Sequence, residues 1–442
     1  MEEKSLPTKI YLIQVKTFQV LDNKSSANSE LIIDAIRAFD SILEGKSASE
    51  FIYNPDRKDS AEFNFLLYGM LRWHHQLLYL IHLLAKKNIN SWQKNLILLL
   101  ELGLFQILFS NKPEYAIVNN ANNATFALGI GKAKSIINAC LRSFLRDRDK
   151  FLFQLHSKDE ANYAHPEWMI KYFKKQFPND WQNILTKNNV QAPMMARINS
   201  RLITNQEYKK FLSSKNISYI ESKEMPFGVI IDPPKPYRDL PGYEIGLVSV
   251  QDFSSQIVVQ ELNPKNGEAV LDICSAPGGK LGYIYELAPQ SQITSVEKDE
   301  VRYEYMLKNM ERLGVVGTFL NLDGQKIENS FPSESFNKVL IDAPCSSLGV
   351  IRRHPEIKHH RRRDDFNSYQ VTQIGLIKSA WPLLKKSGEL LYSVCTYSDE
   401  ETNEVISKVK KEFENMKIIS TRLILPGESG MNGLYYAKLK KL

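Results

Sequence analysis

The sequence predicts a multidomain protein with an N-terminal all-α bundle, a small α+β connector, and a C-terminal α/β domain with a Rossmann-like parallel sheet. Three observations predict this fold class. The chain has 442 residues, more than one hydrophobic core usually holds. Apolar residues recur at helical spacing in the N-terminal part, whereas short aliphatic runs alternate with helical stretches in the C-terminal part. We divide the chain into residues 1–27, 28–150, 151–241 and 242–442.

The all-α bundle, residues 28–150, is predicted from segments whose apolar residues are spaced three and four apart. These segments are 35–45, 63–87, 92–109 and 134–151. The run 95–109 is the most apolar, but Glu101 and Gln106 interrupt it, and it is shorter than the roughly 20 residues of a membrane span. We therefore expect a buried helix and no membrane association. Residues 1–27 receive no assignment.

The connector, residues 151–241, mixes helical and strand-like patterns. Short helices are predicted at 166–177 and 204–212, and strands at 194–200, 217–222 and 228–234. The proline-rich stretch Asp232–Pro241 cannot continue regular structure. It marks the boundary with the domain that follows.

The C-terminal α/β domain, residues 242–442, contains five strand-like runs with helical segments between them. The runs are 268–274, 291–297, 318–323, 337–345 and 388–396. This alternation predicts βαβ units and a parallel sheet covered by helices on both faces. In such sheets ligands bind at the carboxyl ends of the strands, beside the topological switch point. The residues that end these strands are therefore the candidate site.

The first strand runs into a glycine-containing turn before a helix. Such a turn lets the backbone approach a ligand, and the helix N-terminus adds donors for a carboxylate. The turn lacks both the dinucleotide pattern GxGxxG and the phosphate-binding pattern GxxxxGK[ST]. The candidate cofactor residues here are Cys274, Ser275, Ala276, Pro277, Gly278, Gly279 and Lys280.

Acidic residues end the next three strands. Glu297 can accept hydrogen bonds from two ribose hydroxyls, Asp323 can meet an adenine edge, and Asp342 ends the fourth strand. Each carboxylate alone is more often a loop cap. In register with the glycine-containing turn, the three predict a ligand that joins a nucleoside to an amino acid, which is the composition of S-adenosylmethionine.

The chain has four cysteines, Cys140, Cys274, Cys345 and Cys395, and no CxxC pair. This spacing favours neither a zinc site nor a disulfide framework, so no metal is expected. Cys140 fits a buried helix face. Cys345 and Cys395 instead follow the fourth and fifth strands, where a thiolate could add to carbon 6 of a pyrimidine and make carbon 5 nucleophilic.

The segments DICSAPGGK, VLIDAPCSSLGVIRRHPEIK and LLYSVCTYSDEETNEVI resemble the motifs of bacterial RNA 5-methylcytosine methyltransferases. The helical part resembles the NusB fold, an RNA-binding bundle. The resemblance implies S-adenosylmethionine at the residues named above. It also implies Cys395 as the nucleophile, Cys345 as the helper in product release, and a contact of Asp342 with the target base. Glu297 departs from the family's commoner Asp.

Basic residues crowd the stretch that follows Cys345. Alone, such a run is usually a solvated helix face. Because the chain also resembles RNA methyltransferases, we interpret this basic stretch as an RNA contact whose side chains bind phosphates. The predicted contacts are Arg352, Arg353, Lys358, Arg361, Arg362 and Arg363.

The expected substrate is a cytosine in 16S ribosomal RNA, naked or in an early assembly intermediate. The net charge of +7 is a mild indication of a polyanionic partner. The N-terminus lacks the basic and apolar regions of a signal peptide, so we expect a cytoplasmic monomer. The alternatives are a cytosine-C5 enzyme acting on tRNA, an amino-group methyltransferase, and a non-catalytic RNA-binding assembly protein.

Overall fold

The computed structural model describes residues 29–52, 57, 59–85, 88–222 and 224–442, so the unassigned segment 1–27 lies outside the described residues. The described chain forms two compact units. The helical unit comprises the residues up to Gln191 together with Ile351–Arg363, and the α/β unit comprises Ala192–Val350 and Asp364–Leu442. The chain therefore leaves the α/β unit after Val350, contributes a short segment to the helical unit, and then completes the α/β unit.

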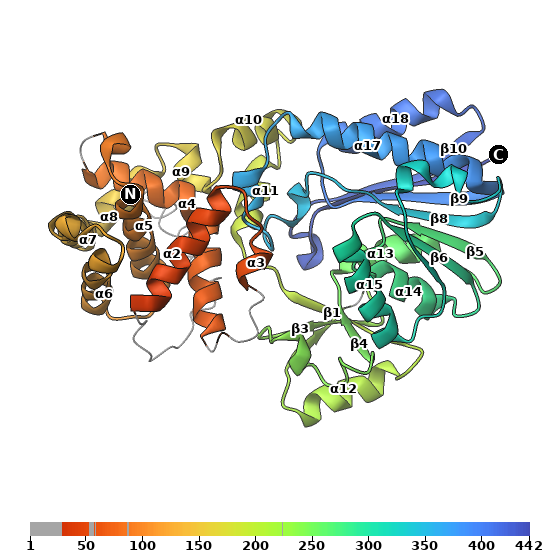
Figure 1. The fold of residues 1–442 in the computed structure, drawn as a ribbon, viewed down its shortest axis with the longest axis horizontal. Helices are drawn as coiled ribbons and strands as arrows, with labels where there is room; N and C mark the ends of the chain where they lie inside the picture. The colour runs from red at the N-terminus through yellow and green to blue at the C-terminus, as the bar shows by residue number, and fades with distance from the viewer. Residues whose placement is uncertain (1–28, 53–56, 58, 86–87, 223) are drawn as a thin grey trace, which may run out of the picture. The chain divides into compact units, whose positions relative to one another are not determined.

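The helical unit is a bundle of helices (Figure 1), and its buried apolar residues form one core. Its most apolar helix, α5 (Lys94–Phe109), packs against α4 (Ser60–Ala85), α6 (Glu114–Ala127) and α7 (Lys134–Arg146). A helix that is apolar on every side needs protein around it. The remaining helices are α2 (Ser29–Leu43), α3 (Ser49–Ile52), η1 (Ile89–Ser91), η2 (Gly131–Ala133), α8 (Arg148–Leu155), α9 (Asp159–Tyr163), α10 (Glu167–Gln176), α11 (Trp181–Asn189) and α16 (Ile357–His360).

The four helices predicted for the bundle are present as α2, α4, α5 and α7. Helix α6 was not predicted, because its sequence EYAIVNNANNATFA has few apolar residues and no clear apolar stripe. None of the helices in the described ranges combines the length and the hydropathy that crossing a bilayer requires.

The α/β unit begins with a small antiparallel sheet of order β2-β3-β1-β4. Thr204 is the N-cap of helix α12 (Asn205–Ser214), and its side chain and that of Glu207 each accept a backbone N–H in a capping box. The short helix η3 (Tyr237–Asp239) precedes the last strand. The strands are β1 (Met194–Ile198), β2 (Tyr219–Glu221), β3 (Gly228–Ile231) and β4 (Val248–Val250).

The two compact units divide the residues of the predicted connector, 151–241, between them, and the bounds of that connector stay a prediction. Its helix α10 belongs to the helical unit, and its strands belong to the α/β unit. The boundary at residue 241 also separates β4 from its partner β1, since a proline-rich loop can lie between two strands of one sheet as well as between two domains. The boundary at residue 150 falls within α8.

The large sheet has seven strands in the order β10-β11-β9-β8-β5-β6-β7. The five predicted strands are parallel, and the chain order reverses at β5, which lies between β6 and β8. Two strands were not predicted: β11 pairs antiparallel with β9, and β10 pairs antiparallel with β11 at the edge of the sheet. The strands are β5 (Ala269–Ile273), β6 (Gln292–Glu297), β7 (Thr318–Asn321), β8 (Phe336–Asp342), β9 (Leu384–Val394), β10 (Met416–Ile424) and β11 (Leu434–Lys441).

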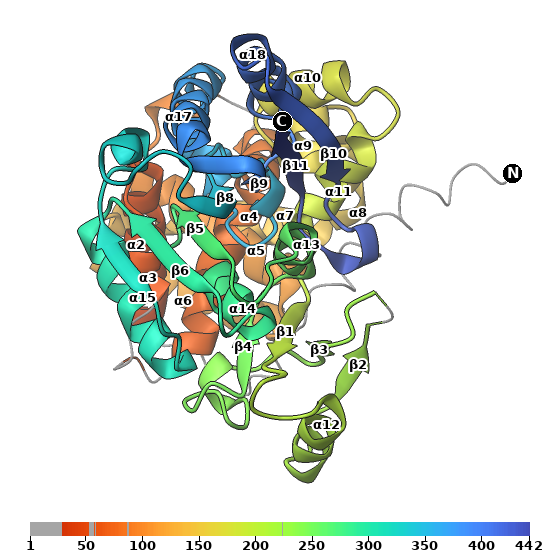
Figure 2. The same cartoon turned by 90° about the vertical axis from the view of Figure 1, so that its right-hand side faces the viewer.

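Helices cover both faces of this sheet (Figures 1 and 2). Alternate side chains of a strand enter different cores: Val270 packs in the core formed with α13, α14 and α15, and Leu271 packs in the core formed with α17 and α18. The helices are α13 (Phe253–Leu262), α14 (Gly279–Leu287), α15 (Glu300–Leu313), η4 (Gly324–Asn329), η5 (Leu348–Val350), α17 (Asp365–Ala380), η6 (Trp381–Leu383), η7 (Asp399–Glu401), α18 (Asn403–Glu412) and η8 (Glu428–Gly430).

Candidate active site

The turn between β5 and α14 is held in a conformation that requires glycine at one position. Gly278 has φ +91°, and a Cβ there would lie 2.4 Å from Met310 Cε. Side chains of α15 bind the carbonyl oxygens of the turn: Arg302 Nη2 donates to Ala276 at 2.7 Å and Asn309 Nδ2 to Pro277 at 2.9 Å. The backbone of the predicted cofactor turn is therefore fixed by protein contacts.

Glu297 is brought to this turn, as predicted from its place at the end of β6. The side chain is buried, and its Oε2 accepts the N–H of Ala276 at 3.3 Å. Asp323 lies just beyond β7 and caps η4, while Lys298 Nζ binds its Oδ2 at 2.8 Å and lowers the pKa of the carboxyl. Its contact with an adenine stays a prediction.

Asp342, the last residue of β8, joins the turn to the neighbouring strand. Lys280 Nζ lies 2.6 Å from Asp342 Oδ2, and Ser393 Oγ on β9 donates to Oδ1 at 3.0 Å. Burial disfavours the charged form of Lys280, but the charge and hydrogen bond of Asp342 outweigh it and raise the pKa of Lys280. The site therefore holds a half-buried ammonium–carboxylate pair.

Asp272, inside β5, is a further carboxyl near this pair. It is fully buried, and neither of its oxygens has a hydrogen-bond partner among the described residues. Burial raises its pKa well above the ordinary value, and the charge of Asp342 adds to this effect. An unpaired buried carboxyl is costly unless a ligand cation or donor meets it.

The two cysteines that follow β8 and β9 are brought together. Cys345 Sγ and Cys395 Sγ lie 3.4 Å apart, and Ser347 Oγ is 3.9 Å and 3.6 Å from them. The hydrogen bond from Cys345, helped by Ser347 and by the charge of Lys280, lowers the pKa of Cys395 although burial opposes this. The same contact and burial raise the pKa of Cys345 well above its usual range.

The loops that carry both cysteines are tied to one buried carboxyl, Glu401. Its Oε2 accepts the N–H of Ser346 at 2.8 Å and Gln373 Nε2 at 3.1 Å, and its Oε1 accepts Ser398 Oγ at 2.7 Å. Burial raises the pKa of Glu401. The Sγ–Sγ separation is thus fixed by contacts outside the thiols themselves.

The structure contradicts two of the predicted RNA contacts, Arg352 and Lys358, which are 4% and 1% exposed. Arg352 donates to the carbonyl oxygens of Val190 and Gln191 just after α11, where a helix end leaves acceptors free. Lys358 Nζ donates to the carbonyl oxygen of Arg72 at 2.9 Å and makes two further bonds. Both cations hold the segment Ile351–Arg363 in the helical unit.

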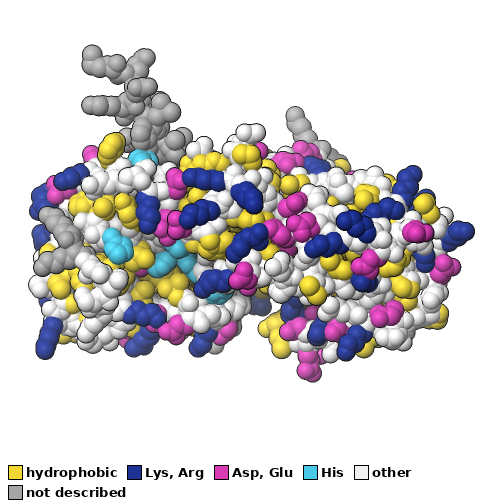
Figure 3. Space-filling model, turned by 90° about the horizontal axis from the view of Figure 1, so that it is seen from above, with side chains coloured by type: hydrophobic (Ala, Val, Ile, Leu, Met, Phe, Trp, Pro, Cys, Tyr) yellow, Lys and Arg dark blue, Asp and Glu magenta, His cyan; other side chains and the backbone are white. Residues whose placement is uncertain are grey.

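The other four predicted RNA contacts lie at or near the surface. Arg353 and Arg361 are half-buried, while Arg362 and Arg363 are exposed. The guanidinium of Arg363 stacks over the ring of Tyr172 at 4.7 Å. On the face drawn in Figure 3, lysine and arginine side chains alternate with acidic ones and form no single basic patch.

Several site residues were missed from the sequence. Asp272 carried a weak signal, since it interrupts an aliphatic strand. Ser347, Ser393 and Glu401 carried none, because serines and acidic residues after a strand are usually loop caps. Within the described ranges, no three His, Cys, Asp or Glu side chains lie together as a metal-binding group.

Comparisons with known proteins match every part of this architecture. The family model described as 16S rRNA methyltransferase RsmB/F matches residues 259–440, that of the RsmF/B-like ferredoxin-like domain matches 165–238, and that of the NusB family matches 16–146. The predicted fold class is thereby confirmed: a NusB-like bundle, an α+β connector and a Rossmann-like methyltransferase domain. The crystal structure of PH0851 has the same fold, with a TM-score of 0.78 over 95% of this chain and 100% of that chain at 21% identity.

Relatives with curated names extend over nearly the whole chain. Ribosomal RNA small subunit methyltransferase B of Photorhabdus laumondii is 34% identical over 92% of this chain and 97% of its own. The protein of that name from Escherichia coli O7:K1 is 33% identical over the same shares. A methyltransferase homologue from Pyrococcus horikoshii is 25% identical, with a TM-score of 0.58 over 64% of this chain and 97% of that chain. The chain therefore belongs to the RsmB/F family of 16S rRNA methyltransferases.

Proposed function

We propose that the protein transfers a methyl group from S-adenosylmethionine to carbon 5 of a cytosine in 16S ribosomal RNA, through a covalent bond between Cys395 and the cytosine. The observation that carries the proposal is the thiol pair. Cys395 and Cys345 lie 3.4 Å apart, and their pKa values are displaced in opposite directions. Two like groups whose pKa values are separated can serve as nucleophile and proton-transfer group.

The residues of the β5–α14 turn fit the cofactor. Asp272 offers a buried carboxyl without a partner, which suits the ammonium of an amino acid, and Glu297 has lone pairs left for ribose hydroxyls. The N-terminus of α14 suits a carboxylate. The candidate residues Cys274 to Lys280, Asp323 and Asp342 complete the proposed site. When bound there, S-adenosylmethionine supplies a methyl group on a positively charged sulfur.

The two cysteines have different roles in the proposed reaction. The Cys395 thiolate adds to carbon 6 of the cytosine, and the electron pair that reaches carbon 5 forms the new bond to the methyl group. Cys345 is held protonated by its hydrogen bond to Cys395 and by burial. Once Cys395 is bound to carbon, the effect of that hydrogen bond disappears, so Cys345 loses its proton to solvent more readily and, as a thiolate, accepts the proton of carbon 5. The electron pair of that carbon–hydrogen bond forms the carbon 5–carbon 6 double bond, and the carbon 6–sulfur bond breaks and returns its electron pair to Cys395.

Asp342 is proposed to contact the target base, with Lys280 and Ser393 holding the carboxylate in place. Arg353, Arg361, Arg362 and Arg363 remain proposed phosphate contacts, which position RNA without reading its sequence. The target base must leave its stack to reach the thiols. We propose 16S rRNA, naked or in an early assembly intermediate, as the substrate of a cytoplasmic, monomeric enzyme.

The test is transfer of labelled methyl from S-adenosylmethionine to unmodified 16S rRNA, with Cys395→Ala and Cys345→Ala as variants. We expect labelled 5-methylcytosine with the wild type, no label with Cys395→Ala, and a stalled protein–RNA adduct with Cys345→Ala. Label in tRNA but not in rRNA would keep the chemistry and change the substrate. Full activity of Cys395→Ala would refute the covalent mechanism.

A further inference from the structure

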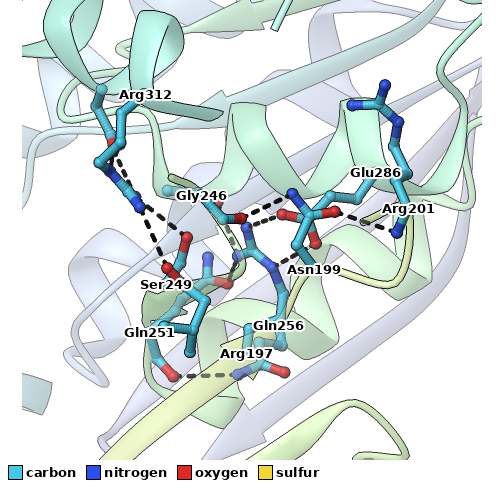
Figure 4. Close-up of polar contacts among 12 residues, drawn as sticks. Arg197, Asn199, Arg201, Gly246, Ser249, Gln251, Gln256, Glu286 and Arg312 are labelled. Carbon is cyan, nitrogen blue, oxygen red and sulfur yellow. Dashed lines mark hydrogen bonds and ion pairs between the residues drawn. The ribbon is translucent and has the colours of Figure 1, made fainter. Parts of the chain in front are cut away.

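A buried ion pair joins the small sheet to the helix that follows the cofactor turn (Figure 4). Arg197, on β1, has no exposed surface. Its Nε and Nη2 donate to the two carboxylate oxygens of Glu286 on α14, at 2.8 Å and 2.7 Å. The planar guanidinium matches a carboxylate in this paired geometry, so the ion pair fixes the direction of the Arg197 side chain.

The third nitrogen of the same guanidinium binds the start of α14. Arg197 Nη1 donates to the carbonyl oxygen of Gly279 at 3.0 Å and to the side-chain oxygen of Gln251. Gly279 is the first residue of α14 and belongs to the proposed cofactor turn. Arg197 thus holds both ends of α14, through Glu286 at one end and Gly279 at the other.

The carbonyl of Gly279, which Arg197 binds, is adjacent in sequence to a residue that contacts the proposed reacting groups. The next residue, Lys280, binds Asp342 at 2.6 Å, and the Lys280 charge contributes to the lowered pKa of Cys395. An ion pair that served stability alone could end at Glu286 and would need no contact with the turn. A third carbonyl of the turn is therefore held by a side chain, beside those held by Arg302 and Asn309.

We infer that Arg197 is a positioning residue for S-adenosylmethionine, which acts by fixing the Gly279 carbonyl and so the orientation of the β5–α14 turn. The inference rests on the proposed function, because it takes this turn to be the cofactor site. It places a determinant of cofactor affinity on the small sheet, outside the residues that touch the cofactor.

The variants separate positioning from stability. Arg197→Met leaves the Glu286 carboxylate buried and unpaired, which destabilises the fold. The double variant Arg197→Met/Glu286→Met removes both charges and keeps apolar volume, an exchange that buried ion pairs often tolerate. Arg197→Lys keeps a positive charge beside Glu286 but loses the planar guanidinium, whose N–H groups bind Glu286 and Gly279 at the same time. The matched control is Arg201→Met, since Arg201 is exposed and lies over Tyr285 of the same helix at 4.3 Å without a bond to the turn.

The experiment measures the dissociation constant of S-adenosylmethionine by calorimetry, kcat and KM at saturating RNA, and the melting temperature. We expect the double variant to melt near the wild type and to bind the cofactor about tenfold more weakly or worse, the factor that one lost charge-assisted hydrogen bond implies. Its kcat at saturating cofactor should change much less than its KM. Arg197→Lys should be intermediate, and Arg201→Met should match the wild type.

Wild-type cofactor affinity in the double variant and in Arg197→Lys would overturn the inference, as would a loss in kcat with KM unchanged. If the double variant does not fold, the comparison of Arg197→Lys with Arg201→Met decides: equal affinities overturn the inference, and weaker binding by Arg197→Lys supports it. Failure of the wild type to bind S-adenosylmethionine would instead refute the proposed function, and the inference with it.

Discussion

Replacing Glu401 by alanine should separate the two cysteine loops. The Glu401 carboxyl accepts hydrogen bonds from Ser346, Gln373 and Ser398 inside the α/β unit, including the N–H of Ser346 at 2.8 Å. Alanine leaves that buried N–H without an acceptor, which costs about 1–3 kcal/mol, and removes the weaker contribution of the side-chain bonds. We expect a total loss of about 3 kcal/mol in the free energy of unfolding, together with a fall in kcat of about 100-fold if the thiols move by about 1 Å.

Glu401→Gln is the matched control. The glutamine oxygen can still accept from Ser346 and Gln373, and its nitrogen can donate to Ser398 Oγ. Because burial already raises the pKa of Glu401, little stabilisation comes from its negative charge, and we expect a loss of less than about 1 kcal/mol.

Both variants are assayed by urea unfolding, by methyl transfer, and by hydrogen exchange at the amide of Ser346. Faster exchange at Ser346 in the alanine variant alone is the expected result. The reasoning is refuted if alanine and glutamine reduce stability and kcat equally, because charge and not hydrogen-bond geometry would then hold the loops.

Three further predictions follow from buried groups. Activity requires the Cys395 thiolate, so kcat/KM should fall on the acid side at a pH below the ordinary thiol pKa. Ser347→Ala should move this fall to higher pH, because the Ser347 hydrogen bond helps to lower the pKa of Cys395. An unchanged pH profile would show that Ser347 does not contribute to the lowered pKa. Burial lowers the pKa of His75 to about 4. Below about pH 6.5 the unfolded chain binds a proton at His75, whereas the native state keeps this side chain neutral down to about pH 4. The free energy of unfolding should therefore fall by about 3 kcal/mol as the pH is lowered from about 6.5 to about 4. Urea titrations at several pH values test this, and His75→Phe should weaken the pH dependence. Lys358→Ala should destabilise the helical unit by about 2–4 kcal/mol, because buried carbonyl oxygens lose their hydrogen-bond donor. The exposed Arg362 is the contrasting position: Arg362→Ala should leave stability unchanged and reduce the salt dependence of RNA binding.

The parallel strands and the residues at their ends could be predicted from the sequence. Aliphatic runs that alternate with helices fix βαβ units, and carboxyl ends of parallel strands meet at one edge. The proximity of Cys345 and Cys395 follows, because β8 and β9 are neighbours. Strand β10 could not be predicted in the same way, since it lies at the sheet edge and most of its side chains are exposed.

Contacts between residues distant in sequence were also beyond prediction. Arg197 and Glu286 are 89 positions apart, and neither stands in a recognisable pattern. For the basic segment Ile351–Arg363, the prediction that Arg352 and Lys358 contact RNA was wrong for a different reason. A run of charges indicates solvent, but Arg352 and Lys358 find backbone acceptors that only the folded helical unit provides.

The segment Ile351–Arg363 also affects how the protein can be made. The helical unit consists mainly of residues up to Gln191, yet synthesis of its last part begins only after about 160 further residues, 192–350, have been added. At ~5–20 residues per second, translation of that stretch takes on the order of ten seconds or more. During this time the nascent bundle lacks the lysine and arginine that bind its interior carbonyls. The N-terminal part of the chain therefore completes its folding late in translation, when most of the α/β unit has already left the ribosome.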